Sequence, residues 1–347
     1  MNSIKKTISL SLIIASAFVT LACAKSDSAK SIGATDSEAG IIGGENVNSR
    51  DSVAARSVVY LNIQKNGITV SGCSATLIGM ETVLTAAHCL DGDRPFDSVY
   101  VEFSTKSETD LKAHRTVGVM TGYALHPKYN TRPYQTTTNV LKGKKWVNVP
   151  TVQMGVAYDH DIAILVFRGG VPSDQKPMKI DTDRNANYAG QKIQVYGYGK
   201  STDWTEQDIR AMELAEAIKA GRAKPDPNTK AVVMNLHRGN FTVRADFDNT
   251  ADAYYNVGDL STGTWICQGD SGGPQFITKN GETKVIGVNS TSDGMVVGKL
   301  MYKGNMKYIK SCKGPGKAIR VAEFADWIQS ARQRLMSDSK TDPRIQR

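Results

Sequence analysis

Three short strings of the sequence carry residue types that together could cleave an acyl bond. Ser271 stands in the string GDSGGP, where residues without side chains let a carbonyl group approach and let backbone N–H groups point at one spot. His88 stands in TAAHC among small residues, which suits a general base whose ring stays fixed. Asp161 opens the alternating string DIAIL, and a carboxylate entering a buried strand needs a partner such as a histidine N–H. Together the strings predict a nucleophile, a general base and an orienting acid.

Other readings of the same residues are open. Asp159 is the alternative orienting acid, but the alternating run begins at Asp161, so we prefer Asp161. Taken alone, GDSGGP is also compatible with an ordinary glycine-rich turn, and it is the combination of strings that favours catalysis. The remaining histidines are predicted to be surface or core residues: His114, His126, His160 and His237.

The elements that must position these residues are predicted to be mostly β-strands. Short apolar runs broken by Gly, Asn and Asp recur at 57–63, 74–78, 99–103, 161–167, 192–198 and 284–289. Many such strands without intervening helical repeats favour antiparallel sandwiches or barrels over a parallel α/β sheet. Two helices are predicted, at 206–220 and at 321–336, where apolar residues recur near helical spacing.

In the order His, Asp, Ser, these strings resemble those of the chymotrypsin-like (trypsin-fold) serine endopeptidases, whereas subtilisins and α/β-hydrolases use other orders. IIGG at 41–44 resembles the family's mature N-terminus, VYGYG at 195–199 the opening of its second barrel, and Pro315-Gly316 with the helix through Trp327 its end. The resemblance covers residues 41 to about 330.

The resemblance implies an all-β fold of two antiparallel six-stranded Greek-key β-barrels, with the active site between them and a C-terminal α-helix. The expected segments are an N-terminal barrel at 41–170, a C-terminal barrel at 171–320, the helix at 321–336 and a polar tail at 337–347.

The resemblance also implies the role of each site residue. The Oγ of Ser271 would attack the scissile carbonyl, His88 would take and return the proton, and Asp161 would orient His88. The backbone N–H groups of Gly269 and Ser271 would bind the oxyanion. The implied reaction is amide hydrolysis through an acyl-enzyme, with protein or peptide substrates and without a cofactor or metal.

Two further expectations come from the same resemblance. The chain would be made as a zymogen and cut between Gly40 and Ile41, so that the new α-amino group of Ile41 pairs with Asp270. Trp265 falls where the base of the specificity pocket lies, at a position where trypsin-like relatives hold an aspartate, so cleavage after Arg or Lys is not expected.

Gln268, Ser290, Ser292 and Gly316 would complete the pocket, with Ser292 at a position that is glycine in relatives with open pockets. We therefore expect a shallow pocket that prefers small or short aliphatic residues before the scissile bond. The alternative is that Trp265 turns into the core and leaves a deep apolar slot for Phe or Leu.

Four of the five cysteines are expected to form two disulfides, because an even number remains in an oxidising compartment once Cys23 is set aside. No pair has the close spacing that a zinc knuckle needs. Spacing alone leaves three connectivities open, and the family resemblance implies Cys73 with Cys89 and Cys267 with Cys312.

The N-terminus predicts export. Lys5 and Lys6 precede the apolar stretch 8–22 and small residues, the pattern of a secretory signal over 1–23, and fifteen apolar residues are too few for a transmembrane helix. Cleavage beside Ala24 would release the protein, whereas lipidation of Cys23 would anchor it as a lipoprotein. Residues 24–40 are Ser/Ala/Asp-rich and predict a propeptide or spacer. The expected location is secreted or in the envelope of a bacterial cell.

Composition excludes other classes. The 347 residues are 40% hydrophobic and 22% charged, as in an ordinary globular protein. The net charge of +9 is scattered, so no nucleic-acid partner is expected, and we expect a monomer.

The insertions 130–157 and 200–262 are interpreted as solvated loops rather than recognition surfaces. The competing function is a catalytically idle, protease-like binding protein that uses these insertions.

Overall fold

The structure is a computed structural model. It describes residues 40–50, 52–91, 96–105, 117–129, 131–142, 145–156, 160–219, 234–244, 254–257, 263–292, 294, 296–302 and 305–341. The predicted signal segment with Cys23, the spacer up to residue 39, His114 and Asp159 lie outside the described residues. No described helix has both the length and the apolar composition that crossing a membrane requires.

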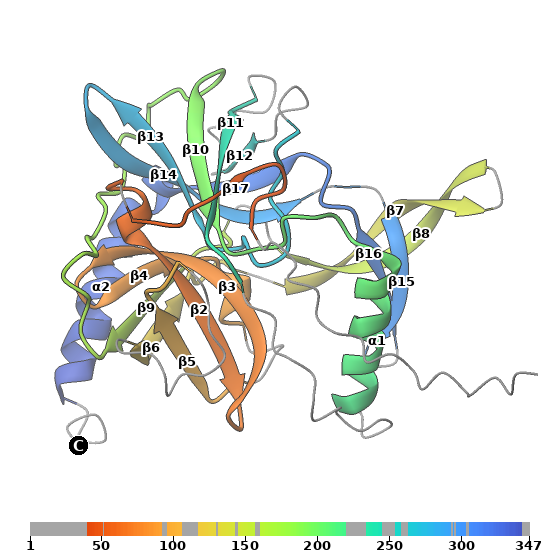
Figure 1. The fold of residues 1–347 in the computed structure, drawn as a ribbon, viewed down its shortest axis with the longest axis horizontal. Helices are drawn as coiled ribbons and strands as arrows, with labels where there is room; N and C mark the ends of the chain where they lie inside the picture. Colours follow the sequence, from red (N-terminus) through yellow and green to blue (C-terminus); the bar gives the residue numbers. More distant parts are fainter. Residues whose placement is uncertain are drawn as a thin grey trace, which may run out of the picture. The chain divides into compact units, whose positions relative to one another are not determined.

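The N-terminal half of the chain forms a closed six-stranded barrel (Figure 1). In hydrogen-bonded order its strands are β2 (Val58–Lys65), β3 (Ile68–Gly79), β4 (Thr82–Thr85), β9 (Ala163–Arg168), β6 (Val117–Leu125) and β5 (Ser98–Glu102). Asn66 and Gly67 have φ of 53° and 74°, the positive values that a two-residue hairpin turn between β2 and β3 requires. Leu61, Leu84 and Leu165 are fully buried and belong to the barrel's core.

The C-terminal half forms a seven-stranded antiparallel sheet. In hydrogen-bonded order its strands are β1 (Glu45–Asn46), β11 (His237–Thr242), β10 (Lys192–Gly197), β13 (Pro274–Lys279), β14 (Glu282–Ser292), β17 (Gly316–Arg320) and β12 (Tyr254–Val257). An isolated bridge between Val243 and Val257 joins the end of β11 to β12, so the sheet curls into a barrel-like shape. The predicted all-β class of two barrels and a C-terminal helix is therefore confirmed, with β1 as an added edge strand.

The C-terminal helix packs on the first barrel. A short 3₁₀ turn, η5 (Val321–Phe324), leads into α2 (Ala325–Thr341), which contacts β6 and β9. The predicted helix at 321–336 thus begins with this 3₁₀ turn, and its α-helical part continues to Thr341. Ile328 is buried in the core of the first barrel, and this apolar face explains why the helix docks there.

The described parts of the two predicted insertions contain regular elements. The insertion 130–157 holds the hairpin β7 (Thr131–Lys142) with β8 (Lys145–Val156), and the insertion 200–262 holds the helix α1 (Glu206–Lys219). A further hairpin, β15 (Val296–Tyr302) with β16 (Asn305–Lys310), lies beyond both insertions. Figure 1 draws them together on one flank, and β15 contacts both α1 and β7. Gly298 makes the α1 contact possible, because a Cβ there would lie 2.4 Å from Cδ1 of Ile209. The helix agrees with the prediction for 206–220, whereas the β15–β16 hairpin was not predicted.

Candidate active site

Two neighbouring strands of the first barrel bring His88 and Asp161 together. His88 lies in the 3₁₀ turn η2 (Ala87–Cys89) just after β4, and Asp161 lies just before β9. Because β4 and β9 are antiparallel, with Thr85 opposite Ala163, the end of one lies beside the start of the other. The His88 Nδ1 is 2.7 Å from Oδ2 of Asp161, and the His88 backbone N–H donates to Oδ1 at 2.9 Å. These two bonds fix the ring.

Asp161 has a third partner that comes from the other sheet. The hydroxyl of Ser290, on β14, donates to Oδ2 of Asp161 at 2.6 Å. Burial by itself raises the pKa of the Asp161 carboxyl, but the charge of His88 and the hydrogen bonds from His88 and Ser290 outweigh it and hold that pKa below its ordinary value. Asp161 is therefore ionised at neutral pH and completely buried. The sequence placed Ser290 only in the pocket wall, and no local pattern signals its bond to Asp161.

Ser271 is held beside η2 by its backbone. Its carbonyl oxygen accepts a hydrogen bond from the backbone N–H of Ser74 at 2.8 Å and lies 3.8 Å from Sγ of Cys89. Gly272, with φ of 80°, allows this approach, because a Cβ there would lie 2.0 Å from Oγ1 of Thr85. The structure thus brings Ser271 to the same corner of the first barrel that carries His88.

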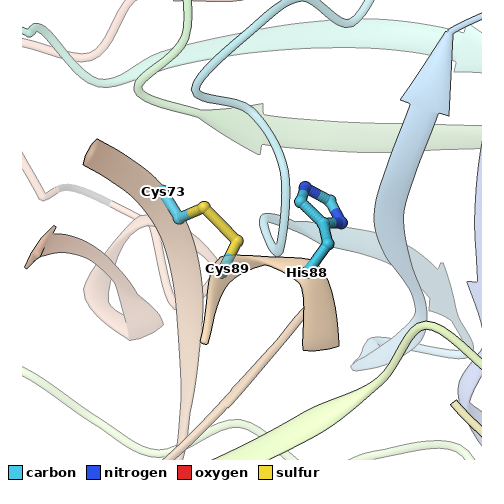
Figure 2. Close-up of side chains that lie close together, drawn as sticks. All are labelled: Cys73, His88 and Cys89. Atoms are coloured by element: carbon cyan, nitrogen blue, oxygen red, sulfur yellow. A yellow bond between two sulfur atoms is a disulfide. The ribbon is translucent and has the colours of Figure 1, made fainter. Parts of the chain in front are cut away.

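One disulfide ties the His88 turn to a strand, and the other joins the segment before Ser271 to a second loop. Cys73 on β3 is bonded to Cys89 in η2, and Cys267 is bonded to Cys312, the pairs that the family resemblance implies. Figure 2 shows the His88 ring beside the Cys73–Cys89 bridge. Among the described residues, these three form the one cluster with ligand atoms close enough for a metal ion. The two sulfurs are bonded to each other, however, so neither is available as a thiolate ligand.

The loop before Ser271 surrounds a buried carboxylate. Asp270 is fully buried and accepts hydrogen bonds from the backbone N–H groups of Cys267 at 2.7 Å and Gly199 at 2.8 Å. Gly197 leaves room for it, since a Cβ there would lie 2.1 Å from Oδ1 of Asp270. Burial raises the pKa of Asp270 to about 7. No basic side chain among the described residues forms an ion pair with it.

The segment after Gly40 is docked close to this loop. Ile41 is fully buried in the core of the second sheet, and Ile42 exchanges two backbone hydrogen bonds of 3.0 Å with Trp265, five residues before Asp270. The backbone of Gly40 has φ of 143° and touches the ring of His237, which is 2% exposed.

The predicted pocket residues lie along β14, β17 and the segment before Ser271. Ser292 pairs with Gly316 across β14 and β17, and Gln268 accepts a backbone bond from Lys200. The Trp265 side chain is 8% exposed and packs with Ile42, Trp204 and the Cys267–Cys312 disulfide. The neighbouring Ile266 is 4% exposed, and its Cδ1 would lie 2.7 Å from a Cβ on Gly316. Ile266 was not among the predicted pocket residues.

Among the described histidines that were not assigned to catalysis, His126 and His160 pack against other aromatic rings, as expected for structural residues. His126 and His160 stack with ring centroids 5.0 Å apart, and His126 also makes edge contacts with Phe324 and Trp327. His160 directly precedes Asp161, so this aromatic cluster supports the backbone that carries the acid.

A two-barrel β fold that places a histidine, bonded to a buried aspartate, beside a serine in a glycine-rich loop defines a serine endopeptidase of the chymotrypsin-like class. The Trypsin family model matches residues 41–328, and the chain belongs to this family.

Known relatives agree with that assignment. The chain is 25% identical over 255 residues to "Trypsin" of Saccharopolyspora erythraea, covering 73% of this chain and 87% of that protein. It is also 25% identical over 231 residues to "Fibrinolytic enzyme, isozyme C" of Lumbricus rubellus, covering 65% and 78%. A solved structure described as "Structure of GrC" has a TM-score of 0.51 at 20% identity and covers 84% of this chain and 100% of its own, which supports the fold.

Proposed function

We propose that this serine endopeptidase cleaves peptide bonds through an acyl-enzyme on Ser271, with His88 as general base and Asp161 as the acid that orients it. The observation that carries the proposal is the bonded pair of His88 and the buried, ionised Asp161, beside which the Ser271 loop is docked. Asp161 holds the Nδ1–H of His88, so the Nε2 can accept the proton of the serine hydroxyl and later return it to the leaving amine.

The tetrahedral intermediate needs a site for its oxyanion. The backbone N–H groups of Gly269 and Ser271 supply it, and Gly269 has the positive φ, 98°, that turns the loop at this point. Each such donor contributes about 3 kcal/mol to transition-state stabilisation.

A fluorophosphonate probe tests the nucleophile, because it labels serines that an adjacent base activates. We expect covalent labelling of the mature protein that Ser271→Ala abolishes. Ser330→Ala, which removes an exposed serine hydroxyl on α2, is the matched control and leaves labelling unchanged. Failure of the mature wild-type protein to label would contradict the proposal and favour a binding protein with an idle site.

The chain is made as a zymogen that is activated by cleavage between Gly40 and Ile41. The docked Ile41 and the completely buried Asp270, which has no basic partner among the described residues, support this step, because a new ammonium group at Ile41 would supply a counter-ion. Breaking a buried pair of this kind costs about 3–5 kcal/mol, so uncut protein should be nearly inert. If protein that retains residues 25–40 hydrolyses peptides as fast as protein cut ahead of Ile41, activation does not work in this way.

The specificity pocket accepts small or short aliphatic residues before the scissile bond. Trp265 packs against Ile42 and the disulfide, whereas Ile266, a core residue of the second sheet, reaches Gly316 in the proposed pocket wall. We therefore assign to Ile266 the bulk that makes the pocket shallow. No carboxylate stands at either position to pair with a basic side chain. Cleavage of a peptide library should therefore fall after Gly, Ala or Val. Dominant cleavage after Arg or Lys would contradict this assignment, and dominant cleavage after Phe would show a deep pocket.

The protein is exported with the help of residues 1–23 and is either released or anchored through Cys23. Both disulfides support an oxidising compartment. Mass spectrometry of the uncut zymogen, isolated with Ser271→Ala, separates the outcomes: a lipidated Cys23 shows an anchor on the propeptide, a start beside Ala24 shows release, and retention of Met1 contradicts export. We keep 171–320 as the proposed second barrel and 41–170 as the proposed first barrel, except that residues 41–46 belong to the second, because β1 pairs with β11 and Ile41 lies in the core of that sheet.

A further inference from the structure

Ser74 is a fully buried residue of β3 that forms hydrogen bonds to Gly269 and Ser271, the two residues that flank Asp270 in the nucleophile loop. Its hydroxyl donates to the carbonyl oxygen of Gly269 at 2.8 Å and accepts from the backbone N–H of Tyr198 at 2.9 Å. Its own backbone N–H donates to the carbonyl oxygen of Ser271 at 2.8 Å. Its carbonyl oxygen accepts from the hydroxyl of Thr85 at 2.9 Å, so its position is itself fixed. One residue of the first barrel therefore holds two consecutive turns of a loop that belongs to the second.

Along the loop, the peptide groups whose carbonyls bond to Ser74 alternate with the peptide groups whose N–H groups are the proposed oxyanion donors. The N–H groups of Gly269 and Ser271 would bind the oxyanion, and Ser74 holds the C=O groups of the same two residues. Fixing both carbonyls restricts rotation about the peptide between them. This restriction matters because Gly269, with φ of 98°, has no side chain to limit its backbone.

The hydroxyl also ties the oxyanion loop to the strand end that contacts Asp270. Tyr198 bonds Ser74, and its neighbour Gly199 donates to the Asp270 carboxylate at 2.8 Å. A Cβ on Gly269 would lie 2.8 Å from Cα of Gly199, so the two backbones touch. A hydroxyl with one donated and one accepted bond satisfies both backbones at once, which an alanine cannot do.

We propose that Ser74 is a positioning residue that holds the oxyanion loop in its productive conformation through its hydroxyl. The proposal rests on the function assigned above to Gly269 and Ser271. Without the hydroxyl, the carbonyl of Gly269 and the N–H of Tyr198 lose their bonding partner in a buried setting, and the loop gains conformations in which the donors miss the oxyanion. The ground-state substrate does not yet need those donors, so its binding is largely spared.

The test compares Ser74→Ala with Thr76→Val in protein cut ahead of Ile41. Thr76 is the matched control, because it is buried on the same strand and its hydroxyl has no hydrogen-bond partner within the described part of the chain. We expect Ser74→Ala to lower kcat by about 10- to 100-fold with KM within about twofold. Affinity for a peptide boronic acid, whose tetrahedral adduct places an oxygen at the oxyanion site, should fall by the same factor. Ser74→Thr, which keeps the hydroxyl, should recover most of kcat, and Thr76→Val should resemble wild type.

The possible results distinguish a failure of the proposed function from a failure of the role assigned to Ser74. A wild-type protein that neither labels nor hydrolyses peptides contradicts the proposed function. An active wild type whose Ser74→Ala variant keeps kcat and boronate affinity within twofold overturns the role of Ser74. Equal losses in Ser74→Ala and Thr76→Val would show a general packing effect and overturn it as well. If Ser74→Ala does not fold, Ser74→Cys replaces it with a weaker donor, and an unchanged kcat in that variant overturns the proposal.

Discussion

The ionisation of Asp270 in uncut protein offers a direct solution test of the activation step. Burial raises the pKa of Asp270 from 3.8 to about 7, and this difference corresponds to about 4 kcal/mol. Because the pKa in the folded protein lies above that in the unfolded chain, the stability linked to this group is fully present below pH 3.8 and is lost as the pH rises through about 7. More than half of this loss, about 2–3 kcal/mol, falls between pH 5 and pH 8.

The perturbation is Asp270→Asn in the uncut chain, with Ser271→Ala in every sample to prevent self-cleavage. Urea unfolding at pH 5, 6, 7 and 8 gives the free energy of unfolding. We expect the parent to lose about 2–3 kcal/mol from pH 5 to pH 8 and the Asn variant to lose far less. Protein cut ahead of Ile41 should also lose little, because its new ammonium group keeps Asp270 ionised at all these pH values.

The control is Asp97→Asn, because Asp97 is exposed, accepts a backbone bond from Asn66, and has a pKa below its ordinary value. That carboxylate is ionised throughout the range and should leave the pH dependence unchanged. The reasoning about burial is refuted if Asp270→Asn and its parent lose the same free energy between pH 5 and pH 8. The reasoning about activation is refuted if cut protein loses as much as uncut protein.

Three further substitutions test other parts of the site. Ser290→Ala removes a hydrogen bond to the ionised Asp161 and should destabilise the protein by about 2 kcal/mol at pH 7. Since that bond lowers the pKa of Asp161, the loss should shrink as the pH falls through the folded pKa, which urea unfolding at pH 7 and pH 3 measures. Ile266→Ala should enlarge the pocket and raise cleavage after Leu or Phe relative to Ala by about 10-fold or more, measured on matched peptides. Replacing both Cys267 and Cys312 by alanine opens a loop of 45 residues and should lower the free energy of unfolding by about 3–4 kcal/mol.

The sequence predicted the parts of the site that depend on local strings. His88, Asp161 and Ser271 each stand in a short run whose residue types indicate a chemical role. The alternation of apolar and polar residues beside them predicts the neighbouring strands. The bond from Ser290 to Asp161 could not be predicted, because it joins β14 of one sheet to the end of a loop in the other. The orientation of Trp265 was also open, because only the packing around Ile42 decides which way an indole turns.

The insertions show that amino-acid composition alone does not predict where strands form. Thr- and Lys-rich residues at 131–156 favoured a solvated loop, yet β7 and β8 pair over twelve residues each. The hairpin at 296–310 was missed because lysines interrupt its apolar residues, so no strand-like run stands out. Helix α1 was predictable, because its boundary is local: Thr205 and Asp208 bond to each other's side chain or backbone at its start.

The insertions are joined to the site by short connections rather than by long tethers. The β7–β8 hairpin ends five residues before Asp161, and the β15–β16 hairpin begins four residues after Ser292. The loop that leads into α1 is bonded to the second disulfide, because Asp203 accepts the backbone N–H of Cys312 at 2.9 Å. Because β15 packs against both α1 and β7, the contacts that fix one of these three segments also help to offset the conformational entropy lost by the others. In the proposed binding mode, with Ser290 and Ser292 of β14 lining the pocket, a substrate lies beside the start of the β15–β16 hairpin, and changes in these elements are expected to alter KM more than the chemistry at Ser271.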